Sequence, residues 1–460
     1  MKHCVAFFST ILIFFAVSFL SVAQIVFEVD ERIDVEPSWS GHPVRLTLLT
    51  TENYQFVAYY DYEQGMVVAQ RKIDDTTWTF KRLPENVGWN SHHDVTMIAD
   101  RDGYLHVSGN MHGVPLVYFR SERPYDVESL VRMSGMTGQQ ESRVTYPQFQ
   151  LGPDDELFFV YRYGGAGQAV HYWNVYDYET RTWSRLFDPQ THFFDGEGLR
   201  SVYYYPDFDP PIFGPDGYFH MTWVWRDTGC AATNHNISYA RSRDLRTWVN
   251  AQGEPYTLPI TFATSGIIDP VPPGGGLINP HQRIGFDLEG RVVVTYSKYD
   301  DRGGPFQGAF QMFNARLENG EWKHYQTTNW DYRWNFGGGG AITIEVNFGP
   351  VEIIDGNLTQ RYYHIEYGNG RFLLDPETLR VVGEAQELVV FPDEIWNNEL
   401  DFPGVGIRWT WDRNDRQRPF ERGQTRYILR WESQDFNRDQ PHPQTPPPSM
   451  LRVFRLRSSE

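Results

Sequence analysis

The sequence DGYLHV at residues 102–107 returns as DGYFHM at residues 216–221. Looser copies are DDELFF at residues 154–159 and EGRVVV at residues 289–294. Each copy places turn-forming residues directly before an apolar run, which is the pattern of a hairpin that leads into a β-strand. A phrase that recurs at long intervals in this way predicts a repeat architecture.

A ring-bearing polar residue stands eight to eleven residues before each of these turns. The set consists of His92, Tyr146, Tyr205 and His281, with His42 as a degenerate earlier member. Its spacings of 50, 54, 59 and 76 residues fit four-stranded blades with loops of varying size. No sustained helical periodicity accompanies it. The sequence therefore predicts an all-β fold, a seven-bladed β-propeller in which residues 24–460 form one domain of about 62 residues per blade.

Residues 1–23 have the pattern of a secretory signal peptide. Lys2 and His3 give a polar start, residues 5–20 are largely apolar, and residues 21–23 are small enough for cleavage before Gln24. The alternative is a signal anchor that stays in the membrane, because the apolar run is close to spanning length. We expect removal, and hence a secreted protein, extracellular or periplasmic, with no membrane span afterwards.

The formal net charge of −18 argues against a nucleic-acid partner. It is compatible with an anionic sugar, because a local arginine cluster can bind a carboxylate or a sulfate on an otherwise acidic surface. Of the two cysteines only Cys230 lies outside the signal peptide, so no intramolecular disulfide can form. We expect a monomer whose partner is an acidic polysaccharide.

The ring-bearing residues are candidates for proton transfer. In a propeller the inner strands begin around one mouth of the central channel, and histidine and tyrosine are both proton-transfer residues. The structural alternative is that these rings are wedges between blades, with their polar tips hydrogen-bonded. Arg162 follows Tyr146 by 16 residues at the end of a predicted strand, and His112 ends the corresponding strand one blade earlier. A glycine-rich turn after Arg162 would let the backbone approach a ligand closely, although such a run also serves as a tight turn between strands.

Cys230 and His235 are five residues apart, and His281 could join them. A cysteine and histidine set of this kind can hold zinc. The alternative is a free thiol beside a loop histidine. A structural zinc or calcium ion is the only bound group that the sequence suggests, and no cofactor is required for the chemistry considered below.

Several short motifs together resemble a known family. They are WNSH at 89–92, DGYLH at 102–106, GNMH at 109–112, TYP at 145–147, YR at 161–162, WRDT at 225–228, LRWE at 429–432 and NRD at 437–439. In this order they resemble the BNR-repeat-containing propeller proteins, and among these the secreted polysaccharide lyases that degrade ulvan. The motifs are spread over most of the chain.

The resemblance implies a seven-bladed propeller that cleaves a uronate-containing glycan by β-elimination. It implies that His92 and His112 are the two family histidines, that Tyr146 is the catalytic tyrosine and that Arg162 neutralises the substrate carboxylate. A further family tyrosine falls within residues 203–205, where the internal repeat selects Tyr205 and spacing alone also allows Tyr204.

The chemistry of elimination is consistent with these residue types. A cation on the uronate carboxylate stabilises the charge that develops when the C5 proton leaves, and two ring residues can exchange the protons. The alternatives are a propeller α-L-rhamnosidase or rhamnose–glucuronate lyase, and a glycan-binding propeller without activity. A hydrolase normally needs two carboxylates at the site, and no such pair is evident in the sequence. The sialidase Asp box is only approximated at residues 242–248, which are one residue short of it.

Overall fold

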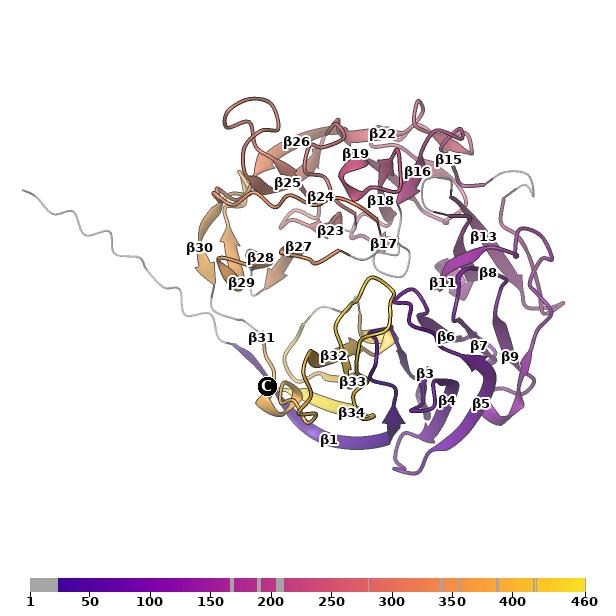
Figure 1. Ribbon diagram of the computed structural model, residues 1–460. Coiled ribbons are helices and arrows are strands. Elements are labelled where there is room, and N and C mark those ends of the chain that lie inside the picture. The colour runs from indigo at the N-terminus through magenta and orange to yellow at the C-terminus, as the bar shows by residue number, and fades with distance from the viewer. Residues whose placement is uncertain are drawn as a thin grey trace, which may run out of the picture.

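The computed structural model describes residues 24–165, 169–187, 192–203, 211–279, 281–339, 342–354, 356–385, 389–416, 418 and 420–459. Seven antiparallel sheets of these residues stand around a common centre as the blades of a propeller (Figure 1). In the part of the chain described, helical structure is limited to the short 3₁₀ turns η1 to η5. The predicted all-β, seven-bladed fold is confirmed.

The first three blades follow the chain in order. Blade one contains β2 (Thr47–Thr50), β3 (Tyr54–Tyr60), β4 (Gly65–Lys72) and β5 (Thr79–Asn86). Blade two contains β6 (Val95–Ala99), β7 (Leu105–Gly109), β9 (Tyr118–Ser121) and β10 (Leu130–Arg132). Blade three contains β11 (Val144–Leu151), β12 (Leu157–Tyr163), β13 (Val170–Asp177) and β14 (Thr182–Arg185), and β8 (His112–Val114) pairs with β11 as an additional edge.

The next three blades continue the same pattern. Blade four contains β16 (Ser201–Tyr203), β17 (Ile212–Phe213), β18 (Phe219–Arg226), β19 (Asn234–Ser242), β20 (Trp248–Val249) and β22 (Gly266–Asp269), beside the small pair β15 (Phe194–Asp195) and β21 (Ile260–Thr261). Blade five contains β23 (Arg283–Phe286), β24 (Val292–Tyr299), β25 (Phe310–Glu318) and β26 (Glu321–Gln326). Blade six contains β27 (Val346–Ile354), β28 (Asn357–His364), β29 (Gly368–Leu374) and β30 (Val381–Ala385).

The seventh blade is built from both ends of the chain, which closes the ring. It contains β32 (Val405–Trp411), β33 (Thr425–Gln434), β34 (Ser449–Ser458) and β1 (Ile25–Ser38), with β31 (Val389–Val390) beside β1. The strand β1 pairs antiparallel with β34 from Phe27 opposite Ser458 to Ser38 opposite Ser449, and it runs along the outer rim (Figure 1). The N-terminal strand β1 and the C-terminal strand β34 thus lie side by side in one blade.

The repeated DGY phrase forms the turn between the first two strands of a blade. Gly103 and Gly217 have φ angles of 84° and 76°, in the left-handed region that favours glycine. The histidine that follows each turn is buried and structural. His106 Nε2 lies 3.1 Å from Asp100 Oδ2 and its Nδ1 lies 2.8 Å from the Tyr118 hydroxyl. His220 makes the same two kinds of contact with Asp216 and Tyr239.

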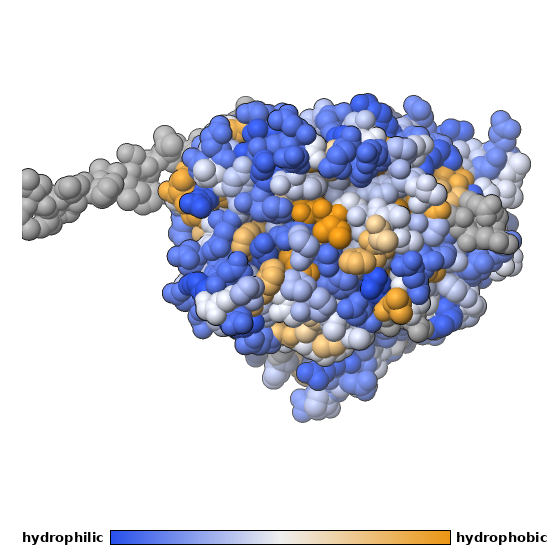
Figure 2. Space-filling view, turned by 90° about the horizontal axis from the view of Figure 1, so that it is seen from above, coloured by the Kyte–Doolittle hydropathy of each residue, from blue (hydrophilic) through white to orange (hydrophobic). Residues whose placement is uncertain are grey.

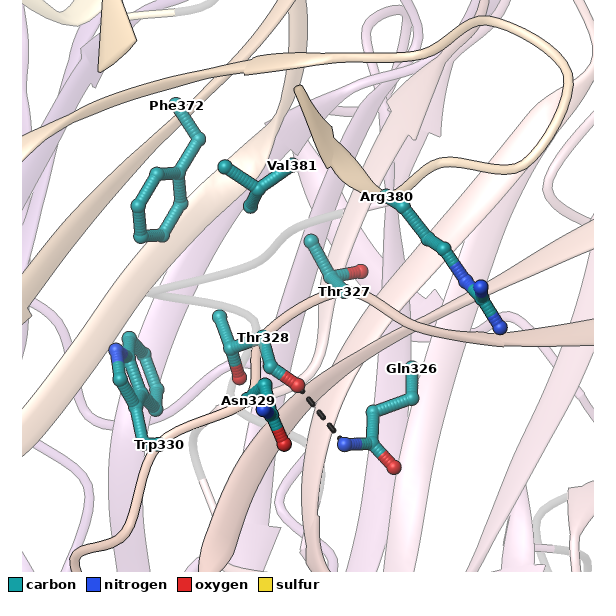
Figure 3. Close-up of a pocket in the computed structure, with 8 residues that line it drawn as sticks. All are labelled: Gln326, Thr327, Thr328, Asn329, Trp330, Phe372, Arg380 and Val381. Atoms are coloured by element: carbon teal, nitrogen blue, oxygen red, sulfur yellow. Dashed lines mark hydrogen bonds between the residues drawn. The ribbon is translucent and has the colours of Figure 1, made fainter. Parts of the chain in front are cut away.

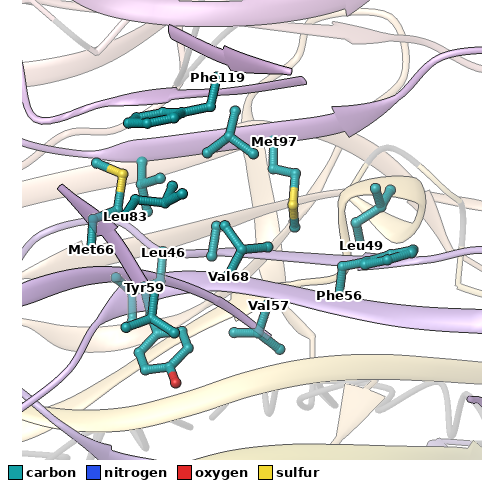
Figure 4. Close-up of a cluster of buried hydrophobic side chains, with 14 of the residues drawn as sticks. Leu46, Leu49, Phe56, Val57, Tyr59, Met66, Val68, Leu83, Met97 and Phe119 are labelled. Atoms are coloured by element: carbon teal, nitrogen blue, oxygen red, sulfur yellow. The ribbon is translucent and has the colours of Figure 1, made fainter. Parts of the chain in front are cut away.

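Apolar faces pack blade against blade. Figure 4 shows Val68 of β4 facing Met97 of β6 and Phe119 of β9, while Val57 of β3 lies on the opposite face of the blade-one sheet; all four are buried. Burial of each such side chain stabilises the fold by about 1.5–3 kcal/mol relative to its exposure to water. One cluster of this kind runs continuously from the closing blade through blades one, two and three. This cluster underlies the two blades that carry most of the predicted site.

The outer surface is strongly polar. The face in Figure 2 is dominated by hydrophilic residues, with apolar residues in small groups among them, as the acidic composition leads one to expect. Of the residues described, no helix is both long and apolar enough to span a membrane. The predicted signal peptide, residues 1–23, lies outside the described residues, so cleavage and secretion stay predictions.

Candidate active site

Four of the five predicted catalytic residues lie together where blades two and three meet. The ring centroids of His92 and His112 are 3.9 Å apart, and those of His92 and Tyr146 are 5.6 Å apart. The guanidinium carbon of Arg162 lies 4.7 Å from the centre of the Tyr146 ring. His92 precedes β6, His112 begins β8, and Tyr146 and Arg162 lie on the paired strands β11 and β12. The fifth, Tyr205, and its alternative Tyr204 lie outside the described residues.

A β-bulge presents Tyr146 to this cluster. The register between β11 and β12 shifts between Thr145 and Gln148, and Tyr146 has a φ of 55°, in the left-handed region. A bulge re-aims a side chain and interrupts pairing, which Pro147 tolerates because it has no backbone N–H to donate. A non-glycine residue in this conformation costs about 1–3 kcal/mol, a strain that is typically kept at functional sites. The strand β11 therefore pairs regularly with β12 along most of its length but not at Tyr146, the catalytic candidate.

Asn90 holds the two histidines in opposite tautomers. Its Oδ1 accepts the backbone N–H of His92 at 3.0 Å, which fixes the orientation of the amide because a backbone N–H can only donate. The same oxygen lies 2.8 Å from Nδ1 of His92, so that nitrogen carries a proton and Nε2 of a neutral His92 has a free lone pair. The Asn90 Nδ2 group donates to Nδ1 of His112 at 2.9 Å, so a neutral His112 carries its proton on Nε2. One ring is thereby prepared to accept a proton and the other to donate a hydrogen bond.

Burial and like charge keep His112 neutral. Its pKa is lowered from 6.5 to about 3, first by desolvation and then by electrostatic repulsion from His92 and Arg162. The neighbouring His93 is affected in the same way, and burial together with His92 lowers its pKa to about 4. At neutral pH both rings are uncharged, so Arg162 is the permanent cation of the cluster.

Arg162 is a buried cation whose contacts leave its charge available. The side chain is 6% exposed, and its Nε has no hydrogen-bond partner among the described residues. The guanidinium group of Arg162 lies over the face of the Tyr146 ring, which attracts a cation without neutralising its charge. A buried guanidinium that has no carboxylate partner in the described part of the chain costs free energy that an anionic ligand would recover. This arrangement suits recognition of a carboxylate on a substrate.

Asp439 joins the cluster from the far end of the chain, and sequence reasoning did not select it as a site residue. It lies between β33 and β34, and its Oδ1 accepts from the backbone N–H of Ser91 at 2.9 Å and from the Ser91 hydroxyl at 2.8 Å. Its Oδ2 is 3.6 Å from Nδ1 of His92, and its Oδ1 is 3.8 Å from Nε2 of His42. Burial raises the pKa of Asp439, but the two histidines and Ser91 outweigh this and hold the pKa well below its usual range. The NRD motif at residues 437–439, one of the motifs that resemble the family, was the sequence feature that could have identified Asp439 as a site residue.

The two remaining ring-bearing residues that the structure describes, His281 and His42, have different surroundings. His281 is fully buried against Trp334 and Phe348, and burial followed by the charge of Arg283 lowers its pKa to about 3. It therefore lies as a wedge between blades, as in the structural alternative, but neither of its ring nitrogens has a hydrogen-bond partner among the described residues. His42 is also buried, packed near Trp39 and Trp89, but it approaches Asp439 and so supports the site from behind.

The expected metal group of Cys230, His235 and His281 does not form. His235 lies between Asp227 and Asn236, at 3.1 and 2.6 Å. The Cys230 sulfur accepts the backbone N–H of Gly338, and His281 is enclosed by aromatic rings elsewhere. Across the described residues, no group of three or more histidine, cysteine, aspartate or glutamate side chains is placed to hold a metal ion. The five-residue spacing was misleading because His235, at the start of β19, is held by Asp227 and Asn236 and not by Cys230.

Two clefts lie away from the proton-transfer cluster. One, of about 500 Å³, is lined by Trp330, Phe372 and Arg380 together with Gln326, Thr327, Thr328, Asn329 and Val381 between blades five and six (Figure 3). The other, of about 390 Å³, lies between blades one and seven and includes Asp412. Neither is lined by His92, His112, Tyr146 or Arg162, so the site is identified by its chemistry and not by the size of a cavity.

Three solved structures of similar fold are polysaccharide lyases. The polysaccharide lyase Uly1 has a TM-score of 0.60 and 13% sequence identity, covering 94% of this chain and 100% of its own. An ulvan lyase of family PL25 has a TM-score of 0.56 and 13% identity, covering 87% of this chain and 93% of its own. The same enzyme bound to the unit -[GlcA(1-4)Rha3S]- matches with 12% identity, the same coverages and the same TM-score. At these identities the likeness establishes the fold alone.

No curated protein sequence matches the chain. The family model of the BNR repeat-containing family matches residues 54–330, from β3 of blade one to the segment after blade five. The match includes His92, His112, Tyr146 and Arg162 and spans more than half of the chain. The protein is therefore a member of the BNR repeat-containing family.

Proposed function

We propose that the protein is a secreted polysaccharide lyase that cleaves a uronate-containing, ulvan-like glycan by β-elimination. The observation that carries the proposal is the placement of a buried cation, Arg162, against Tyr146 and next to a histidine pair with opposite tautomers; among the described residues no carboxylate pairs with this cation. Elimination needs a cation for the carboxylate, a base and an acid, and this cluster contains one candidate for each.

Arg162 binds the carboxylate of the uronate in this mechanism. The C5–H bond is only weakly acidic, and its proton becomes removable when the negative charge that spreads onto the carboxylate is stabilised. A guanidinium offers two parallel N–H donors to a carboxylate, so it fixes the orientation of the sugar as well as its charge. The low exposure of Arg162 strengthens this interaction because little water competes for it.

His92 and Tyr146 transfer the protons. The free Nε2 lone pair of His92 removes the C5 proton, and the C5–H electron pair forms the C4=C5 double bond. The C4–O4 bond breaks, its electron pair goes to O4, and the Tyr146 hydroxyl gives that oxygen a proton. Proton return from His92 to Tyr146, directly or through solvent, restores the enzyme. His112 donates an Nε2–H hydrogen bond to the substrate and stays neutral throughout, as its low pKa requires.

The choice of glycan is supported by the structural relatives. Two of the solved structures with this fold are of an ulvan lyase, and in one of them it is bound to the unit -[GlcA(1-4)Rha3S]-. A glucuronate in the reacting position supplies the carboxylate that Arg162 suits. Secretion is supported by the signal-peptide pattern of residues 1–23 and is required for a polymeric substrate outside the cell.

The deciding experiment incubates the purified protein with ulvan and with a neutral glycan. A lyase produces an unsaturated uronate, seen as new ultraviolet absorbance, with one new reducing end for each double bond. New reducing ends without unsaturation would indicate a hydrolase, and binding without either product would indicate a glycan-binding propeller. Either result contradicts the proposal.

A further inference from the structure

The segment between β33 and β34, residues 435–448, reaches from the closing blade to the site. In Figure 1 it is a yellow loop that extends toward the centre of the ring, beside the purple connection that leads into β6. Hydrogen bonds from Ser91 to Asp439 confirm this contact, which joins residues 348 positions apart. We call residues 435–448 the closing arm.

The closing arm is held in one conformation by its own contacts. The side chain of Asn437 donates to the backbone of Pro441, and His442 contacts the backbone oxygen of Asp435. Arg408 of β32 pairs with Asp435 at 2.6 Å, and the Ser40 hydroxyl donates to Pro447. Such contacts reduce the entropy that the arm would lose on binding a ligand.

Backbone strain is concentrated where the arm meets the site. Arg438 and Asp439 are consecutive non-glycine residues with φ angles of 50° and 59°. The left-handed region is unfavourable for both, and more so for arginine. This strained pair brings the Asp439 carboxylate within reach of Ser91 and His92, and strain of this kind is commonly retained for function.

Phe436 presents an aromatic ring to solvent beside the same cluster. It is 57% exposed, and its ring lies edge to face with His42, with centroids 6.3 Å apart. His42 and His92 flank the one carboxylate of Asp439, so Phe436 stands next to the proton-transfer residues. The apolar face of a pyranose ring suits an exposed aromatic ring that a rigid loop holds in place.

We propose that the closing arm is a working part of the active site, in which Asp439 positions His92 and Phe436 forms a stacking platform for the sugar ring next to the reacting uronate. The inference rests on the proposed function. Asp439 and Asn90 hold His92 from the Nδ1 side, which leaves Nε2 directed away from them for the substrate. Asp439 is a positioning residue, because it acts through His92, whereas Phe436 would touch the substrate itself.

The two residues predict different kinetic signatures. Asp439→Asn keeps the size of the side chain and removes its charge, so kcat should fall by about 10- to 100-fold while KM stays within about twofold. The acid limb of kcat/KM should also move to lower pH, because a charged His92 loses its counter-ion. The titratable and charged groups that contact or adjoin His92 are His93, His112, Tyr146 and Asp439, with His42 behind Asp439 and Arg162 over the ring of Tyr146.

Phe436→Ala should raise KM about tenfold and leave kcat nearly unchanged, because the platform binds substrate and transition state alike. Phe436→Trp should restore KM, since any aromatic face can stack. The matched controls are Glu321→Gln, whose carboxyl is 75% exposed in an ion pair on blade five, and Phe213→Ala, which removes a ring that is 59% exposed on blade four. Both controls should behave as the wild type.

The inference is overturned for Asp439 if a folded Asp439→Asn protein keeps its kcat and pH profile. It is overturned for Phe436 if the alanine variant keeps the wild-type KM and the wild-type affinity for a uronate oligosaccharide measured by calorimetry. The calorimetric comparison also separates this inference from the proposed function. A wild type that binds the oligosaccharide without producing unsaturation disproves the lyase, yet the loss of affinity in Phe436→Ala would still show the platform.

Discussion

The imidazole rings of His92 and His112 lie face to face, with centroids 3.9 Å apart and planes inclined by 14°. Burial and the charge of its neighbours lower the pKa of His112 to about 3, so this ring does not compete with His92 for a proton. Asn90 completes the relationship, because its amide accepts from one ring and donates to the other. Two chemically identical side chains thus acquire different roles from one asymmetric neighbour.

Asn90→Asp should impair catalysis while conserving the fold. A carboxylate can still accept from His92, but it cannot donate to Nδ1 of His112, which must then change tautomer or become protonated. We expect kcat to fall about 10- to 100-fold, in line with the loss of other groups that orient catalytic histidines. Histidine titration by NMR should show a raised pKa for His112. An unchanged titration with full activity would mean that the amide does not set the tautomers.

Tyr146→Phe removes one oxygen and keeps the ring that packs in the bulge of β11. If the hydroxyl protonates the leaving oxygen, kcat should fall about 100-fold or more, which is the usual contribution of a general acid. The melting temperature should change little. Tyr163→Phe is the matched control, since the Tyr163 hydroxyl lies on the neighbouring strand and contacts Ser142 at 3.1 Å. Equal activity in the two variants would place the chemistry elsewhere on the propeller.

Arg162→Ala should abolish turnover of a uronate glycan in a folded protein. Loss of a cation from a buried carboxylate site costs several kcal/mol of transition-state stabilisation, so about 100- to 1,000-fold or more in kcat/KM. Arg162→Lys should recover only part of this, because an ammonium lacks the two parallel donors. Arg181→Ala is a suitable control, because Arg181 covers the ring of Tyr104 in a comparable way on the outer surface. A folded, active Arg162→Ala protein would show that the residue is structural.

The propeller could be predicted from the sequence because the residues that specify each blade are close together in the chain and recur from blade to blade. The DGY turns at Gly103 and Gly217 need only a left-handed glycine and an adjacent apolar strand, and both appear as short contiguous motifs. The equivalence of His92, Tyr146 and His281 also followed from repetition. A repeat predicts where in a blade a residue lies, but not which side chains surround it. His281 occupies the repeat position of His92 and Tyr146, yet it is enclosed by aromatic rings.

The parts of the site that could not be predicted from the sequence depend on contacts between segments that are far apart in the chain and meet only in the folded propeller. Asp439 meets Ser91 only because β1 and β34 complete one blade and bring the arm over blade two. The left-handed conformation of Tyr146 results from pairing between β11 and β12, which no local pattern of residues specifies. The failed metal group shows the converse, since Cys230 and His235 are close in sequence but flank the 3₁₀ turn η3 and contact different partners, Gly338 for Cys230 and Asp227 and Asn236 for His235.

Heat stability should fall as the pH drops from about 6.5 toward 3, and His281 should account for part of this fall. Burial lowers the pKa of His281 from 6.5 to about 3, and His112 shifts in the same direction. In the unfolded chain both rings bind a proton near pH 6.5, so below that pH the unfolded state binds more protons and is favoured. The stability contributed by the neutral rings is therefore complete above pH 6.5 and is lost progressively as the pH falls.

His281→Leu replaces the buried ring by an apolar side chain that cannot be protonated. Neither ring nitrogen of His281 has a hydrogen-bond partner among the described residues, so the substitution leaves no broken contact of that kind. The melting temperature of the variant should stay near that of the wild type at pH 7.5 and exceed it by several degrees at pH 4. Differential scanning calorimetry across this range, with wild type in the same buffers, measures both slopes. Parallel slopes would mean that His281 takes up its proton without unfolding the blades, and the burial argument for this ring would then fail.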